Sequence, residues 1–98
     1  MLSKNEIIRI LSHIKGRLAQ YGVSSIGLFG SFVRGDANND SDIDILIDFQ
    51  SDKETYLNFI SSCELIEKEL GGQRIDIVTL KGLSPFIGKR ILNEVEYV

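Results

Sequence analysis

The chain has 98 residues, 43% of them hydrophobic, which suits a single domain spanning residues 1–98 and leaves no room for a separate substrate domain. Its formal net charge of −3 argues against a protein that follows a nucleic acid backbone, because such proteins usually carry a basic stripe. One cysteine excludes an internal disulfide, and neither a signal-peptide pattern nor an apolar run of spanning length occurs. We therefore expect a cytoplasmic location, with no membrane partner and no direct nucleic acid partner.

The first predicted element is an amphipathic helix over residues 4–20. Its apolar residues recur at helical spacing, and Ser3 with Glu6 three positions later matches a capping box. His13 lies off the apolar stripe, so we expect a surface position for it rather than a role as acid, base or ligand. Gly22 lies just beyond the predicted end of this helix.

Two predicted strands flank a glycine turn. Residues 25–29 are short and apolar enough for a buried strand, after which Gly30-Ser31 begins a brief helix that ends near Gly35. A loop rich in Asn and Asp follows, and residues 43–49 then alternate in the manner of a strand. The local order is therefore strand, turn, helix, loop and strand.

The second half of the chain predicts a helix, a strand and a last helix. Residues 53–70 carry an apolar stripe that includes Cys63, expected to be a packing residue, and Gly71-Gly72 supplies the helix stop. Residues 73–80 predict a strand, and residues 84–92 begin with Ser-Pro, the order of an N-cap and a first helical position. The final residues fit an extended segment, and the strand order stays open.

The Gly30-Ser31 turn combines backbone amides, a hydroxyl and a helix N-terminus, which is a combination that grips a phosphate. In the alternative interpretation, which is the commoner one for an isolated Gly-Ser pair, the turn merely begins a helix. A P-loop does not fit, because Asp36-Ala37 stands where that motif requires Lys-Ser/Thr.

Asp42 and Asp44 are expected on one face at the start of the strand 43–49, about 6.7 Å apart. Two carboxylates at that distance repel by roughly 2.5 kcal/mol at an effective dielectric constant near 20, so a divalent cation is the economical explanation. The alternative is a solvated strand end. A calcium loop does not fit, because Ile45 and Ser51 replace its glycine and its bidentate glutamate.

Asp76 lies in an apolar run, where a lone buried carboxylate is costly unless it is paired or bound to a metal ion. If its strand lies beside residues 43–49, one metal ion would be shared with Asp42 and Asp44, and a second would be held with triphosphate oxygens. Asp76 would then help to deprotonate the attacking hydroxyl. The alternative is an ion pair with Arg74 on the same strand face.

The cationic side chains leave two interpretations open. Arg34 could reach a phosphate, which is the interpretation we favour slightly, or it could pair with Asp36 or Asp40 in the acidic loop. Lys89 and Arg90 could neutralise triphosphate charge or face a partner, although cations on a helix surface are usually just solvated.

Together these residues form the pattern Gly-Ser-x-x-Arg-Gly-x-Ala-x-x-x-Ser-Asp-x-Asp, followed by the strand residue Asp76. The pattern resembles that of the nucleotidyltransferases of the DNA polymerase beta superfamily, and within it the minimal nucleotidyltransferase (MNT) family. The resemblance covers nearly the whole chain, and one departure is Val33, where the family often has alanine. The residues of this chain that match the pattern are Gly30, Ser31, Arg34, Gly35, Ala37, Ser41, Asp42 and Asp44.

This resemblance implies a polymerase-beta-like α/β fold, with a small mixed sheet flanked by helices. It also implies Asp42, Asp44 and Asp76 as catalytic residues that bind Mg²⁺, with two ions expected, and ATP held by Gly30-Ser31 with Arg34.

The resemblance further implies a hetero-oligomer with a HEPN-domain ribonuclease toxin. The chain would act as an antitoxin that transfers AMP from ATP to a tyrosine of that toxin. Two alternatives stay open: an antitoxin that inhibits by stoichiometric docking alone, and a transferase that acts on a small hydroxylated compound.

Overall fold

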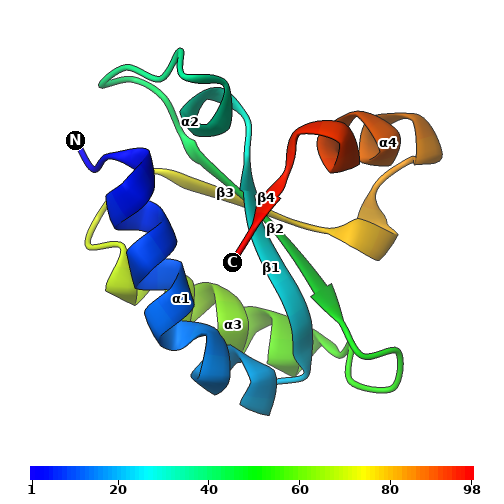
Figure 1. Ribbon diagram of the computed structural model, residues 1–98. Coiled ribbons are helices and arrows are strands. Elements are labelled where there is room, and N and C mark those ends of the chain that lie inside the picture. The colour runs from blue at the N-terminus through cyan, green and yellow to red at the C-terminus, as the bar shows by residue number, and fades with distance from the viewer.

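The computed structural model describes residues 1–98 and contains one four-stranded sheet flanked by helices (Figure 1). The α/β class with a small mixed sheet is therefore confirmed. The elements in chain order are α1 (Lys4–Gln20), β1 (Val23–Phe29), α2 (Ser31–Arg34), β2 (Ile43–Phe49), α3 (Tyr56–Glu69), β3 (Ile75–Thr79), the 3-10 helix η1 (Leu80–Gly82), α4 (Pro85–Glu94) and β4 (Glu96–Tyr97).

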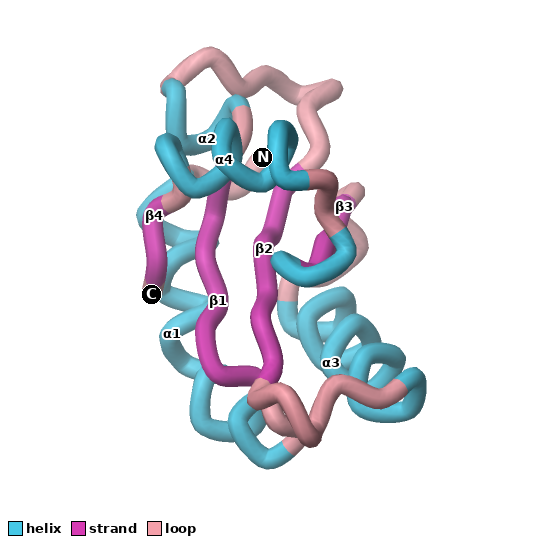
Figure 2. Tube along the Cα trace, turned by 90° about the vertical axis from the view of Figure 1, so that its right-hand side faces the viewer, coloured by secondary structure: helices cyan, strands magenta, loops and turns pink.

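The strands lie in the order β3-β2-β1-β4. Strand β2 is antiparallel to β1 and parallel to β3, and β4 is antiparallel to β1 at the opposite edge (Figure 2). In this register Asp44 lies opposite Phe29 on one side and opposite Asp76 on the other. The end of β1, the start of β2 and the start of β3 therefore meet in one region.

Helix α1 begins and ends where its sequence predicts. The Glu6 amide donates to Ser3 Oγ at 3.1 Å and the Ser3 amide donates to Glu6 Oε1 at 3.0 Å, which completes the capping box. His13 is exposed, as expected. Gly22 follows the helix with a φ of +87°, a left-handed conformation that favours glycine.

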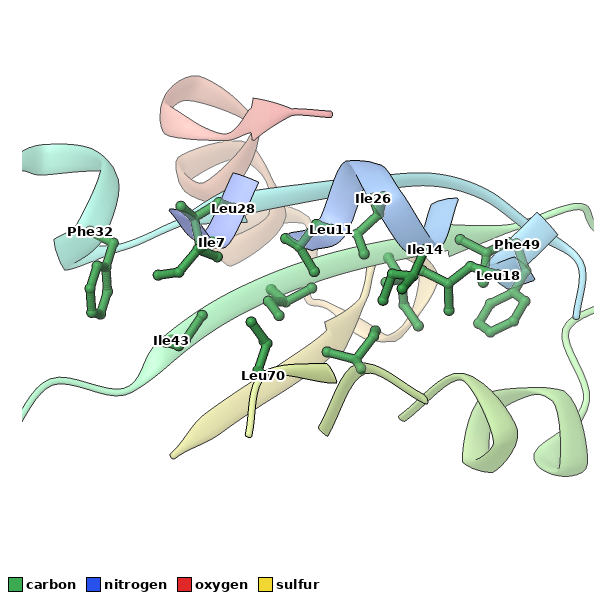
Figure 3. Packing of buried hydrophobic residues seen from close by; sticks show 14 residues of the cluster. Ile7, Leu11, Ile14, Leu18, Ile26, Leu28, Phe32, Ile43, Phe49 and Leu70 are labelled. Carbon is green, nitrogen blue, oxygen red and sulfur yellow. The ribbon is translucent and has the colours of Figure 1, made fainter. Parts of the chain in front are cut away.

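The hydrophobic core lies between the sheet and the pair of helices α1 and α3 (Figure 3). One face of β2 points into this core, while Asp44, Leu46 and Asp48 alternate to the other face. Each fully buried aliphatic side chain contributes roughly 1.5–3 kcal/mol, so this core fixes the register of β2. Its fully buried members include Ile7, Leu11, Ile14, Leu18, Ile26, Leu28, Ile45, Ile47 and Ile66.

Several elements differ from the prediction at their ends, and β1 begins at Val23 rather than at residue 25. Helix α3 begins at Tyr56 rather than at residue 53, because Thr55 accepts a hydrogen bond from the Asn58 amide at 3.1 Å and caps it. Strand β3 ends at Thr79, since Leu80 enters the 3-10 helix. None of the helices combines the length and the apolar character that a membrane crossing requires.

Cys63 is half-buried in α3, and its packing role was predicted. Burial, followed by the charges of Glu67 and Glu64, raises the pKa of its thiol to about 11. The thiolate is therefore scarce at neutral pH, as expected for a packing residue rather than a nucleophile.

Candidate active site

Gly30 lies between β1 and α2 as the N-cap of that helix, and it has a φ of +78°, which glycine adopts without strain. A Cβ atom at this position would overlap the Asp44 Oδ2 atom, so the turn lies directly against that carboxylate. The amides of Val33 and Arg34, three and four residues further along, both donate to the Gly30 carbonyl and so close the short helix. Glycine at position 30 therefore allows the turn and the acidic strand to touch.

Asp44 and Asp76 are register partners on neighbouring parallel strands, so their side chains lie on the same face of the sheet. Burial raises the pKa of Asp44 to about 6, and the Asp76 and then the Asp42 carboxylates add to that increase. Strand β3 lies beside β2, as the interpretation of Asp76 as a metal ligand requires, and Asp76 faces Asp44 in the register. Burial is thus the larger cause of the raised pKa of Asp44, and repulsion by the Asp76 carboxylate is the next.

Asp42 lies one residue before β2 and faces a cation. Arg74 Nε lies 3.3 Å from Asp42 Oδ1, and the same guanidinium donates to the Asp40 carbonyl. The ion pair expected as an alternative, between Arg74 and Asp76, is not formed. No group of three acidic, histidine or cysteine side chains lies close enough to hold a metal ion. The structure thus brings Asp44 and Asp76 together and leaves Asp42 beside Arg74.

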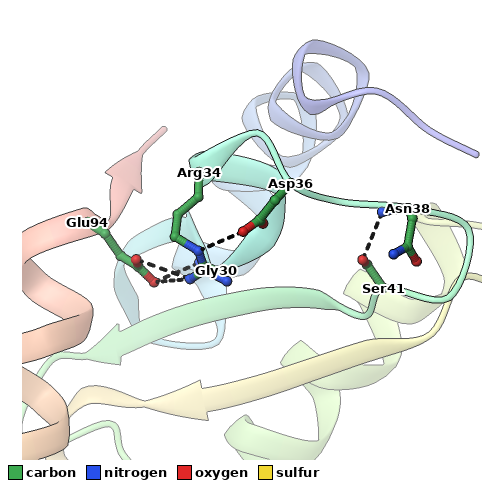
Figure 4. A network of polar contacts seen from close by, with 6 residues as sticks. All are labelled: Gly30, Arg34, Asp36, Asn38, Ser41 and Glu94. Carbon is green, nitrogen blue, oxygen red and sulfur yellow. Dashed lines mark hydrogen bonds and ion pairs between the residues drawn. The ribbon is translucent and has the colours of Figure 1, made fainter.

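Arg34 points back across the turn toward two carboxylates (Figure 4). Its Nε lies 3.4 Å from Asp36 Oδ2, which matches one of the two predicted partners in the acidic loop, and Asp40 is not a partner. Its Nη1 donates to both oxygens of Glu94 at 3.3 Å. The hydrogen bond to Glu94 and the charge of Asp36 raise the pKa of Arg34.

The loop between α2 and β2 is held by its own side chains. The Asn38 amide donates to Ser41 Oγ at 2.9 Å (Figure 4). The Asp40 amide donates to Asn38 Oδ1 at 2.8 Å. Such local side-chain bonds are typical of Asn and Ser in turns. They fix the entry to β2 and so the position of Asp42.

A cavity of about 280 Å³ opens beside the turn, between the end of β1 and helix α4. This volume is close to the lower end of the usual range for small-molecule pockets. Of the two cations considered on the last helix, Arg90 lines this cavity and Lys89 does not. The complete lining is Phe29, Gly30, Arg34, Asp44, Ile87, Arg90, Ile91 and Glu94.

Sequence reasoning missed Glu94, because a lone glutamate in the last turn of a helix carries no motif signal. Its partners, Gly30 and Arg34, are 64 and 60 residues away along the chain. Ile87 and Ile91, which form the apolar wall of the cavity, were missed as well, because isoleucines on a helix carry no motif signal either. Only the placement of α4 beside the turn brings these residues to the site.

The nucleotidyltransferase domain family matches residues 6–98 of this chain. The chain belongs to that family. Among its relatives, the protein adenylyltransferase MntA of Thermococcus cleftensis is 46% identical over 99 residues, which cover 100% of this chain and 98% of the relative. A candidate protein adenylyltransferase of Methanocaldococcus jannaschii is 38% identical over 102 residues, covering 100% of each chain.

Solved structures share the fold of this nucleotidyltransferase. A structure described as that of a candidate minimal nucleotidyltransferase has a TM-score of 0.83 and 29% identity, and the match covers 97% of this chain and 95% of that one. A toxin–antitoxin crystal structure with AMP-PNP has a TM-score of 0.66 and 23% identity, covering 98% of this chain and 72% of that one. The resemblance to the minimal nucleotidyltransferases, predicted from the motif, is confirmed.

Proposed function

We propose that this nucleotidyltransferase is a protein adenylyltransferase, which transfers AMP from ATP to a tyrosine of a partner protein. The observation that carries the proposal is the contact of the Gly30 turn with Asp44, which itself faces Asp76 on the next strand. The name of the relative from Thermococcus cleftensis, similar over its whole length, supports the same activity.

ATP would occupy the cavity beside the turn, with its phosphates toward Gly30-Ser31. Arg34 and Arg90 both line that cavity and would neutralise part of the phosphate charge. The apolar side chains of Ile87 and Ile91 form the wall on α4 and would contact the uncharged part of the nucleotide.

Asp42, Asp44 and Asp76 would hold Mg²⁺. The fit rests on the donors themselves: all are carboxylate oxygens, which Mg²⁺ prefers. A cation would also relieve the repulsion that adds to burial in raising the pKa of Asp44. Asp42 would have to leave Arg74, but both side chains of that ion pair are more than half exposed, so it is worth at most about 1 kcal/mol. Bound Mg²⁺ supplies positive charge to the phosphate oxygens.

In the transfer, the tyrosine oxygen attacks the α-phosphorus of ATP and forms a new phosphorus–oxygen bond. The bond between the α-phosphorus and the bridging oxygen breaks, and pyrophosphate leaves with that oxygen. Asp76, exposed at the edge strand, would accept the proton of the tyrosine hydroxyl. The protein acceptor is proposed to be a HEPN-domain ribonuclease toxin in the cytoplasm, bound as a hetero-oligomer.

The test is mass spectrometry of the protein encoded next to this one, after co-expression. We expect an added mass of AMP on a tyrosine of that neighbour, and its loss in the variant with Asp42→Asn and Asp44→Asn together. Asp48→Asn is the matched control, because Asp48 lies on the same face of β2 but pairs with Lys81 at 3.0 Å, away from the turn.

Two outcomes would contradict the proposal. Addition of AMP that survives the double substitution would show that the carboxylates of this chain do not carry the reaction. Full inhibition of the neighbour by the double variant, at equal concentration and without added AMP, would favour inhibition by docking alone.

A further inference from the structure

The Glu94 carboxylate is held by two donors that belong to the proposed nucleotide site. The Gly30 amide donates to Glu94 Oε1 at 3.0 Å, and Arg34 Nη1 donates to both carboxylate oxygens at 3.3 Å (Figure 4). The Glu94 side chain lines the cavity and is 29% exposed. A negatively charged group of this chain thus lies on the glycine turn.

A carboxylate oxygen and a phosphate oxygen make the same demands on these donors. Both accept from a backbone amide and from a guanidinium, and both gain from the charge of the guanidinium. The Gly30 amide has only one hydrogen, so it cannot give a full hydrogen bond to Glu94 and to a phosphate at once. The two acceptors therefore exclude one another at this amide.

We propose that Glu94 competes with a phosphate group of the nucleotide for Gly30 and Arg34, and so sets the affinity of the site for ATP. This inference rests on the proposed nucleotide site. Nucleotide binding then requires Glu94 to leave the turn. The apparent affinity equals the affinity of the open site multiplied by the fraction of molecules in which Glu94 has left the turn. The apparent dissociation constant is thus higher than that of the open site.

The position of Glu94 suits a side chain that can leave without unfolding its helix. It is the last residue of α4, and the hydrogen bond from the Val95 amide to the Ile91 carbonyl, at 2.8 Å, ends the helix behind it. Ile91, one turn earlier, is buried and anchors the helix. Rotation of one partly exposed side chain is therefore enough to free the Gly30 amide.

The test is isothermal titration calorimetry with Mg²⁺ and α,β-methylene ATP, which resists the cleavage that AMP transfer requires. Glu94→Gln keeps the shape but replaces the carboxylate with a neutral amide oxygen, which is a weaker acceptor for Arg34 and Gly30. We expect it to lower the dissociation constant about threefold to tenfold, as when the site is free in roughly a tenth to a third of wild-type molecules. Glu94→Asp keeps the charge but shortens the side chain, so it should also bind more tightly.

Glu96→Gln is the matched control. Glu96 lies two residues further along, carries the same charge and pairs with Lys4 at 2.7 Å instead of the turn. Its replacement should leave the dissociation constant within twofold of wild type, which separates the contact with Gly30 from a general change in charge. Thermal unfolding of each variant verifies that it is folded.

Equal or weaker binding by both Glu94 variants would overturn the inference and leave the proposed function standing. The same gain in affinity for Glu96→Gln would also overturn it, because the effect would then be one of net charge. If neither the wild type nor any variant binds the analogue with Mg²⁺, the proposed function fails and the inference fails with it.

Discussion

Replacing Asp44 with asparagine is expected to stabilise the protein at pH 7.5 when metal ions are removed with EDTA. Asp44 is partly buried and faces the Asp76 carboxylate, with Asp42 two residues away. Its burial, followed by the charges of these two neighbours, raises its pKa to about 6 from an ordinary 3.8. The charged form is thus disfavoured in the folded state. Asparagine removes the charge while keeping the shape.

The size of the effect follows from this change in pKa. A difference of about 2 pKa units corresponds to about 3 kcal/mol at full strength. Because Asp44 is partly exposed and solvent screens its charge, we reduce the expected gain to about 1 kcal/mol. For a domain of this size, that gain raises Tm by about 4–8 °C.

The pH dependence has a definite sign. The folded protein holds the Asp44 proton more tightly than the unfolded chain, so wild-type stability is lost as pH rises from about 4 through about 6. The advantage of Asp44→Asn should therefore be complete above about pH 7 and roughly half as large at pH 5. Differential scanning calorimetry at both pH values measures it.

The same experiment with Mg²⁺ tests the metal-binding role of these carboxylates. The ion should raise the Tm of the wild type and do so much less for Asp44→Asn, because a ligand that binds only the folded state stabilises it. A lower Tm for the variant at pH 7.5 without metal would refute the reasoning. A gain equal at both pH values would refute it too, since the effect would not come from ionisation.

Three further changes have definite expected outcomes. Gly30→Ala places a methyl group against Asp44 at a residue with positive φ, so it should lower the free energy of unfolding by about 1–3 kcal/mol and abolish AMP transfer. An active variant that is as stable as the wild type in thermal unfolding would contradict the close contact. Arg90→Gln should raise the dissociation constant for ATP about fivefold in calorimetry, whereas Lys89→Gln should not, because only Arg90 lines the cavity. Equal effects of the two substitutions would show that ATP does not bind beside Arg90. Leu11→Ala should cost about 2–5 kcal/mol in urea unfolding because Leu11 is fully buried, and a cost under 1 kcal/mol would contradict its place in the core.

Local signals explain why much of the fold could be predicted from the sequence. The capping box at Ser3 and the apolar spacing predicted the bounds of α1, and the alternation over residues 43–49, interrupted only at Leu46, predicted β2. The motif around Gly30 and Asp44 predicted the family, which is confirmed. These features depend on residues close together in the chain, where propensity and periodicity act.

The remaining features depend on contacts between distant segments. The parallel pairing that puts Asp76 opposite Asp44 and the return of the chain as β4 could not be read from local patterns. The contact of Glu94 with Gly30 needs the placement of α4, which no motif encodes. The pairing of Asp42 with Arg74 likewise depends on how β3 enters the sheet. The roles proposed for these residues stay predictions.

Strand β3 is one of the two edge strands of the sheet, and this bears on the size of molecule that the enzyme can modify. Asp76 is exposed on that strand, whereas the cavity proposed for ATP lies on the far side of Asp44, toward β1 and α4. A bulky acceptor can therefore approach from the open flank without entering the compartment that holds the nucleotide. ATP and the acceptor hydroxyl would thus approach Asp44 from different sides. This arrangement suits a hydroxyl that belongs to a folded macromolecule.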